Sequence, residues 1–242
     1  MRNHAVFVVA TLSAFLFIGG LRAADDPLPS WNDGPVKAAI VDFVRVATDP
    51  QSPSFVENAD RIATFDNDGT LWVSHPLYAQ AMFALDRVRD LSAQHPEWKD
   101  QDPFKAVLAG DREAMAIFNE GDWAKIIAVT HAGMSNEDFS QIVKTWLAEA
   151  KHPHFKRPYT DLVYQPMLEV MDYLRVHGFR TYIVTGGGQE FVRVFSEHVY
   201  GVPVEHVVGS SVVTRYEQRD GTPVLMREPE IFFIDDKAGK PI

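Results

Sequence analysis

Cysteine is absent from this chain of 242 residues, which excludes a disulfide framework, a thiolate metal site and a cysteine nucleophile. Glycine and proline, with 15 residues each, follow no period, and this excludes collagen-like and repeat architectures. Basic residues are also few, because 23 Lys and Arg stand against 33 Asp and Glu for a formal charge of −10. A nucleic-acid groove needs a basic face, so nucleic acid is not an expected partner, and a small anion needs a local site.

Apolar residues are plentiful, at 46% of the chain, and 12% of the residues are aromatic. A chain of this composition buries enough apolar surface to form a substantial core, which excludes disorder for most of its length. We expect one large domain, or a core domain that carries an inserted lobe.

The amino-terminal segment resembles a secretory signal peptide. Arg2 precedes the uncharged residues 5–20, and Ala23 precedes an acidic pair, as at a cleavage site, although Leu21 departs from the small-residue pattern. The uncharged run is shorter than the roughly 20 residues of a spanning helix. We expect residues 1–23 to be removed on export to the periplasm or the medium, which leaves no stable membrane span. An uncleaved amino-terminal anchor is the alternative.

Strand-like and helical patterns alternate along the rest of the chain. Residues 61–65 and 180–184 are short apolar runs typical of buried strands, and a hairpin is expected after residue 210. Apolar residues at helical spacing predict the following helices: 36–46, 77–91, 167–176 between Pro166 and Gly178, and a segment from the glycine run at 186–188 to about 199.

The region between the two predicted strands is helical, and Ser135 and Asp138 occupy the positions of a capping box there. Residues 73–156 are too many and too helical for a single crossover between parallel strands. We therefore expect an α/β fold, with a Rossmann-like parallel sheet formed by residues 24–72 and 157–242 and an inserted helical cap formed by residues 73–156.

Two carboxylates follow the first predicted strand, at Asp66 and Asp68 of the segment DNDGT. Ligands of open α/β sheets bind beyond the carboxyl ends of the strands. One aspartate there can attack phosphorus, and a second can protonate the leaving oxygen and later activate water, with a divalent metal to balance the charges. The same residues also suit an Asx turn, whereas a calcium loop fits less well because its later glutamate is missing.

The end of the second predicted strand carries a phosphate-binding pattern. Thr185 leads into Gly186 and two further glycines, followed by a predicted helix whose free N–H groups can bind an anion. The two predicted strands thus end in DxDGT and TGGG, and a helical insertion separates them. This combination indicates a phosphate site more specifically than either motif does alone.

With these motifs the chain resembles the haloacid dehalogenase superfamily, and within it the phosphoserine-phosphatase-like branch. The resemblance implies that Asp66 is the nucleophile, that Asp68 is the general acid and base, and that Thr185 and the Gly186 amide bind phosphate. It also implies Mg²⁺ as the cofactor, held by Asp66 and by the backbone carbonyl of Asp68. Asp68 favours phosphate esters as substrates, because the dehalogenase and phosphonate-cleaving branches lack this residue.

The family also has a lysine after the second motif. After Thr185 the first lysines are Lys237 and Lys240, of which we favour Lys240. A fourth, acidic motif of the family completes the metal site, and the chain ends before such a motif, so we expect a truncated reading frame. Asp235 and Asp236 are the alternative candidates for that motif.

Two further groups of residues have a less specific pattern. Residues 151–157 form a basic cluster around His152 and His154 that we expect to be solvated, with contact to an anionic substrate as the alternative. Trp72, Trp123 and Trp146 are expected in the core, with a cap pocket as the alternative.

Together these patterns predict a Mg²⁺-dependent phosphomonoester hydrolase that acts through an aspartyl-phosphate on a small phosphorylated metabolite. The substrate is expected to be phosphoserine or, given export, a broader range of esters. The alternatives are a non-catalytic phosphate-ester binder, an inactive fragment that lacks the fourth motif, and a phosphotransferase or phosphomutase with the same nucleophile.

Overall fold

The structure is a computed structural model that describes residues 26–240. The predicted signal peptide, residues 1–23, lies outside the described residues. None of the helices in the described part of the chain combines the length and the apolar character that a membrane span requires.

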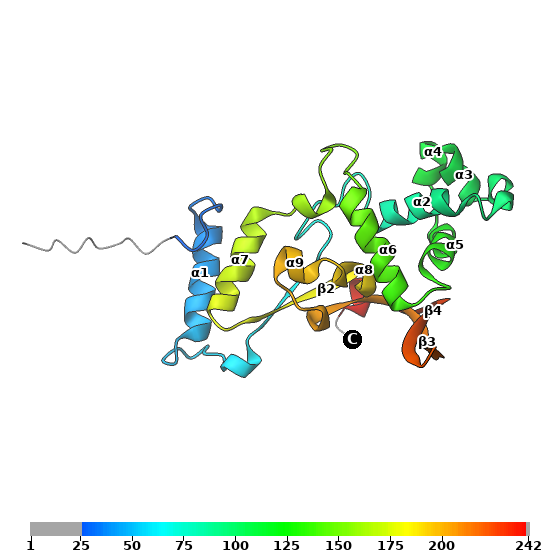
Figure 1. Ribbon diagram of the computed structural model, residues 1–242. Coiled ribbons are helices and arrows are strands. Elements are labelled where there is room, and N and C mark those ends of the chain that lie inside the picture. Colours follow the sequence, from blue (N-terminus) through cyan, green and yellow to red (C-terminus); the bar gives the residue numbers. More distant parts are fainter. Residues whose placement is uncertain (1–25, 241–242) are drawn as a thin grey trace, which may run out of the picture.

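A four-stranded mixed sheet forms the centre of the fold (Figure 1). Its strands, in spatial order, are β1 (Ile62–Phe65), β2 (Arg180–Gly188), β3 (Val207–Arg219) and β4 (Thr222–Phe233). The first three are parallel, whereas β4 runs antiparallel to β3. The predicted α/β fold with a parallel sheet is therefore confirmed, with one antiparallel strand at its edge.

Strand β3 belongs both to the parallel sheet and to the hairpin. Its first residues pair with β2, with Val207 opposite Ile183, and its remainder pairs with β4. The hairpin turn at Asp220 and Gly221 has positive φ at both residues, 52° and 81°, as a type I′ turn requires. The hairpin was predicted, but the parallel start of β3 was missed because only a few residues of it pair with β2.

The glycine run continues strand β2, and this corrects the prediction that the strand ends at residue 184. Gly188 still pairs with Ser210, across an irregularity in the register that begins at Thr185. The single helix expected up to about residue 199 is also wrong. It is replaced by α8 (Gln189–Arg193) and α9 (Ser196–Tyr200). The helix breaks at buried Phe195, where the backbone leaves helical geometry (φ −125°, ψ −10°).

Helices α1 (Pro35–Thr48) and α7 (Gln165–Val176) contribute to the main hydrophobic cluster, and they lie beside each other at one end of the molecule (Figure 1). Both begin with a proline in the first turn, where the missing N–H costs no hydrogen bond. Gly178 follows α7 with φ 81°, a conformation that favours glycine. The predicted boundaries of α7 are therefore confirmed.

Helices occupy the region between β1 and β2, as predicted. They are α2 (Ala79–Leu91), α3 (Phe104–Ala109), α4 (Arg112–Ala116), α5 (Glu120–His131) and α6 (Asn136–Glu149). The capping box at the start of α6 is formed, because the Ser135 hydroxyl accepts from the Asp138 N–H at 3.0 Å and the Asp138 carboxylate accepts from the Ser135 N–H at 3.4 Å.

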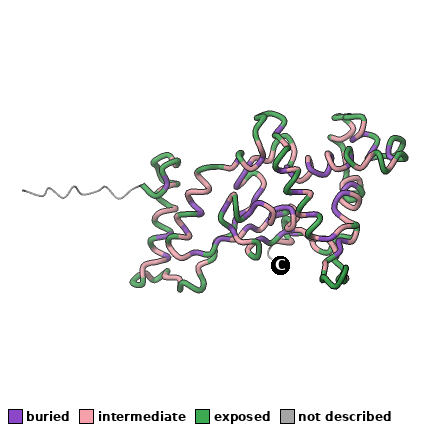
Figure 2. Tube along the Cα trace, in the orientation of Figure 1, coloured by how far each residue is buried: buried purple, intermediate pink, exposed green. Residues whose placement is uncertain are grey.

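Two hydrophobic clusters stabilise the chain, and Figure 2 shows buried residues both along the central strands and in the helical region. The smaller cluster joins the second half of α2 to α3 and α5. Residues Phe139, Val143 and Leu147 of α6 instead belong to the larger cluster around the sheet. The division of the chain at residues 73 and 156 stays a prediction, but α6 packs against β4, α8 and Phe83 of α2 rather than in the smaller cluster.

Candidate active site

A tight loop after β1 positions the two carboxylates of the first motif. The buried Asn67 carbonyl accepts the N–H groups of Thr70, Leu71 and Trp72, at 3.2, 2.8 and 3.3 Å. Gly69 has φ 80°, which a residue with a side chain rarely adopts. The chain thus turns sharply where the strand ends, and the residues on either side of Asn67 lie at the carboxyl end of the sheet.

Asp68 is held by the indole of Trp72, whose Nε1–H donates to Oδ1 of the carboxylate at 2.8 Å. Burial raises the pKa of Asp68, the Trp72 hydrogen bond opposes this shift, and the charge of Asp66 adds to it. Burial and the neighbouring carboxylate thus favour the protonated form, which is the form that a general acid needs.

Asp66 forms an ion pair with Lys240, whose Nζ donates to Oδ1 at 2.9 Å. The same ammonium group donates to the Val184 carbonyl at 3.1 Å, so it joins strand β2 to the residue that follows β1. The side chains remain partly accessible, with 41% of Asp66 and 29% of Lys240 exposed. Lys237, by contrast, is exposed and makes no ion pair among residues 26–240.

The phosphate-binding candidates lie at the end of β2. Thr185 is buried, and its Oγ1 accepts from the Gly187 N–H at 3.1 Å, while its hydroxyl hydrogen has no acceptor within the described residues. A Cβ added to Gly186 would lie 3.4 Å from the Asp236 side chain, which therefore packs directly over this glycine. The hydroxyl hydrogen of Thr185 is thus free to donate to a ligand.

Asp235 is buried, and a hydrogen-bonded serine links its backbone to the glycine run. Its N–H donates to Ser210 Oγ at 3.0 Å, and that hydroxyl donates to the Gly186 carbonyl at 2.8 Å. Its carboxylate oxygen Oδ2 is buried without a hydrogen-bond partner. Burial raises the pKa of Asp235, and the nearby Lys240 opposes this shift. Asp235 and Asp236 do not assemble a cluster of metal ligands with other acidic or histidine side chains of the described segment.

The donor set of the first motif nevertheless suits a magnesium ion. Mg²⁺ in phosphoryl-transfer sites is bound by one or two carboxylates and completes its shell with water and substrate oxygens. Asp66 and Asp68 supply such hard oxygen ligands, and one oxygen of Asp66 makes no hydrogen bond among residues 26–240. The pair fits an ion that the substrate helps to hold.

One cavity of about 450 Å³ contains these groups. The candidate residues of the sequence that line it are Asp66, Asp68, Thr185, Gly186, Asp236 and Lys240. Its size suits a small ligand. The structure thus brings residues from the end of β1, the end of β2 and the segment after β4 to one place.

Comparison with protein families finds a match to the haloacid dehalogenase-like hydrolases over residues 63–232. The chain belongs to this family. No similar sequence was found among curated proteins.

Solved structures resemble this hydrolase at low sequence identity. A conserved protein of unknown function from Anaerococcus prevotii is 13% identical, with a TM-score of 0.53 over 85% of this chain and 74% of the other, a likeness that concerns the fold alone. A protein of unknown function from Bordetella pertussis is 20% identical, with a TM-score of 0.43 over 75% and 70%. A phosphoserine phosphohydrolase-like protein from Francisella tularensis is 18% identical, with a TM-score of 0.34 over 67% and 62%.

A chain of hydrogen bonds leads from the glycine run of the hydrolase into its helical region. The Gly188 N–H donates to Gln80 Oε1 at 2.7 Å, so the amide nitrogen of Gln80 donates to His131 Nε2 at 3.1 Å. The proton of the imidazole therefore sits on Nδ1 and is donated to Thr130 Oγ1 at 2.7 Å, while that hydroxyl donates to the Ile126 carbonyl. With a neutral His131, each donor in this series of hydrogen bonds therefore has an acceptor.

The neutral state of His131 follows from its surroundings. The imidazole is buried, and burial lowers its pKa to about 3, with the charges of Arg227 and Arg87 acting in the same direction. His131 therefore lines the cavity as a neutral group at physiological pH.

Arg227 of β4 joins the hairpin to the turn between α5 and α6. Its N–H donates to the Met134 carbonyl at 2.9 Å, and its own carbonyl accepts from the Gly133 N–H at 2.8 Å. Its guanidinium Nε donates to the His131 carbonyl at 2.6 Å, and Arg227 is one of the residues that line the cavity. The hairpin thus supplies one wall of the candidate active site.

Sequence reasoning did not identify Gln80, His131 or Arg227 as site residues. Each lies in a predicted helical segment or hairpin and belongs to no motif, so no local signal marks it. Their contacts join segments that are far apart in the chain.

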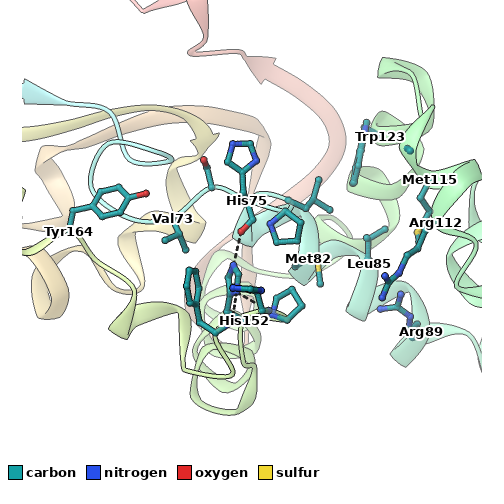
Figure 3. Close-up of a pocket in the computed structure, with 17 residues that line it drawn as sticks. Val73, His75, Met82, Leu85, Arg89, Arg112, Met115, Trp123, His152 and Tyr164 are labelled. Carbon is teal, nitrogen blue, oxygen red and sulfur yellow. Dashed lines mark hydrogen bonds between the residues drawn. The ribbon is translucent and has the colours of Figure 1, made fainter.

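A second, larger cavity of about 1000 Å³ lies beyond Trp123, which lines both cavities (Figure 3). Figure 3 shows Arg89 and Arg112 on one side of it, with His75 and His152 on the other. Its lining residues include no acidic side chain.

The predicted basic cluster is only partly a solvated surface, because His152 is fully buried. Its Nδ1 accepts from the N–H groups of His154 and Phe155, both at 3.2 Å, so its Nε2 carries the proton that is donated to the His75 carbonyl at 2.7 Å. His152 thus joins two loops, while its charged neighbours Lys151, Lys156 and Arg157 are exposed.

The three tryptophans have different positions. Trp72 is buried and stacks on Phe195, with ring centroids 4.6 Å apart, and Trp146 packs against the main hydrophobic cluster. Both therefore lie in the core, whereas Trp123 lines the two cavities.

Proposed function

We propose that this hydrolase cleaves small phosphomonoesters through an aspartyl-phosphate on Asp66. The observation that carries the proposal is the contact of 2.9 Å between Lys240 Nζ and Asp66 Oδ1, in a cavity that Asp68 and Thr185 also line. A nucleophile, a second carboxylate and donors for an anion thus share one small site.

The reaction that this arrangement supports has two steps. An oxygen of Asp66 attacks phosphorus, the bond from phosphorus to the leaving oxygen breaks, and Asp68 gives its proton to that oxygen. Asp68 then takes a proton from water, the water oxygen attacks phosphorus, and the bond to Asp66 breaks. Lys240, the Thr185 hydroxyl and the Gly186 N–H hold the phosphoryl oxygens, so catalysis is mainly positioning and charge neutralisation.

We also propose that Mg²⁺ is the cofactor and that Asp66 and Asp68 hold it. When bound, it supplies the positive charge that lets two carboxylates and a phosphate share one site. The proposal is supported by the oxygen donors of this pair and by the family, whose members generally use Mg²⁺.

Phosphoserine and a broader range of small esters both fit within a cavity of about 450 Å³. We also propose that the enzyme acts after export, because residues 1–23 resemble a secretory signal peptide. Amino-terminal sequencing of protein secreted by a bacterial host tests this, and a mature chain that begins after Ala23 is the expected result.

The test of the function is phosphate release from p-nitrophenyl phosphate by the wild type and by Asp66→Asn. We expect turnover with Mg²⁺, loss of turnover with EDTA, and loss in the variant. Full turnover by folded Asp66→Asn would contradict the assignment of the nucleophile. Binding of phosphate esters without turnover by the folded wild type would favour the non-catalytic binder.

A further inference from the structure

Arg227 is a buried cation with neutral partners. Only 5% of the residue is exposed. Its Nε donates to the His131 carbonyl at 2.6 Å, its Nη1 donates to Asn136 Oδ1 at 2.9 Å, and its guanidinium lies 4.2 Å from the centre of the Phe139 ring. No carboxylate within residues 26–240 forms an ion pair with it. A buried charge without a counter-ion is costly, so the site favours an anion.

The neighbouring titratable groups do not supply that anion. Glu190 is the acidic residue that favours the charged form of Arg227, but its carboxylate is paired with Arg193 at 2.6 Å. Burial lowers the pKa of Arg227 to about 10, which still leaves it charged at neutral pH. His131 is neutral and adds no charge of either sign.

The guanidinium also has capacity for another ligand. Its Nη2 makes no hydrogen bond among the described residues, and it is not one of the fully buried atoms that lack a partner. Arg227 lines the cavity that contains Asp66 and Lys240. The lining of this cavity also includes neutral side chains, among them Gln80 and Ile127.

We propose that Arg227 binds a carboxylate of the substrate, so that the preferred substrates are small phosphomonoesters that carry a carboxylate. The planar guanidinium matches a carboxylate in shape, and the ion pair replaces the missing counter-ion. This inference rests on the proposed function, because it assigns the phosphoryl group to Asp66 and Lys240 and the carboxylate to the hairpin wall.

The test compares phosphoserine with phosphoethanolamine, which lacks only the carboxylate. For the wild type we expect a kcat/KM ratio of about 10 to 100 in favour of phosphoserine, as a hydrogen-bonded charge pair supplies. Arg227→Gln is expected to bring the ratio close to one. The control is Arg215→Gln, which removes an exposed arginine of the same hairpin that pairs with Glu217 and Glu228 and should leave the ratio unchanged.

A purely structural role of Arg227 gives a different result. It lowers kcat/KM for both esters equally and leaves their ratio unchanged, and that outcome overturns the proposal. If Arg227→Gln does not fold, as thermal melting will show, Arg227→Lys keeps the charge but loses the planar fork. A drop in the ratio for this variant supports the proposal, and an unchanged ratio overturns it.

A failure of the proposed function is recognised separately. If the folded wild type hydrolyses neither ester nor p-nitrophenyl phosphate, the catalytic proposal fails, and calorimetric titration tests the subsite alone. Binding of phosphoserine that Arg227→Gln weakens about tenfold or more, with no change for phosphoethanolamine, supports the carboxylate subsite. Equal binding of phosphoserine by both proteins overturns it.

Discussion

The indole N–H of Trp72 donates to the carboxylate of Asp68, four residues earlier, at 2.8 Å. The indole is itself fixed, because it is buried and stacks on Phe195 with the ring planes 24° apart. A core residue therefore orients a carboxylate of the candidate active site, and the tight loop after β1 makes this contact possible.

Trp72→Phe should retain the aromatic packing and lose the hydrogen bond to Asp68. We expect kcat for p-nitrophenyl phosphate to fall about tenfold with little change in KM, because general acid catalysis depends on the position of the carboxyl group. The control is Trp146→Phe, which loses a comparable bond of 3.0 Å to Asp86, outside the cavity lining. Equal kcat values for the two variants would refute a positioning role of Trp72.

Lys240→Met should remove the cation that contacts Asp66 and that is placed to neutralise a bound phosphoryl group. Loss of one stabilising donor in such a site lowers kcat by about 100-fold or more. Lys237→Met is the matched control, since this exposed lysine makes no ion pair in the described segment, and its kcat should equal that of the wild type. A greater loss in Lys237→Met than in Lys240→Met would assign the family lysine to residue 237.

His131 should make folding stability depend on pH. Its folded pKa of about 3 lies below the ordinary value of 6.5, so the unfolded chain binds a proton that the folded chain does not. The stabilising contribution is complete above about pH 6.5 and is lost as the pH falls toward 3, by up to about 1.4 kcal/mol per pH unit.

Urea unfolding at about pH 7.5, 5.5 and 4.5 measures this dependence, with the first value on the plateau and the other two within the sloping range. His131→Asn should have a shallower slope than the wild type, whereas His198→Asn changes an exposed histidine and should retain most of the slope. Identical slopes for the wild type and His131→Asn would show that the buried imidazole is not the cause.

Gly178→Ala and Gly221→Ala separate backbone strain from steric contact. Both glycines have φ 81°, and an added Cβ would lie 2.4 Å from Asn58 Oδ1 at Gly178 but would meet nothing within 4 Å at Gly221. Each substitution should cost about 1 kcal/mol of unfolding free energy from the backbone, and Gly178→Ala should cost more. Chemical denaturation measures both, and a larger loss at Gly221 would contradict the steric argument.

Local patterns in the sequence determined the first strand, the boundaries of α7, the capping box of α6 and the hairpin turn. Each depends on residues close together in the chain, such as Ser135 and Asp138, or on the backbone preferences of glycine and proline. The order of these elements also determined the α/β class. The motif residues were recognisable because Asp66 and Asp68 follow an apolar run and Thr185 lies between another apolar run and three glycines.

Only the tertiary structure decided which distant residues complete the site. The choice between Lys240 and Lys237 depends on which ammonium group reaches Asp66, and the place of Arg227 depends on the register of β3 and β4. The extension of β2 through the glycine run likewise depends on pairing with β3. These contacts join segments far apart in the chain, so their energy depends on packing and hydrogen bonding that no local sequence pattern contains.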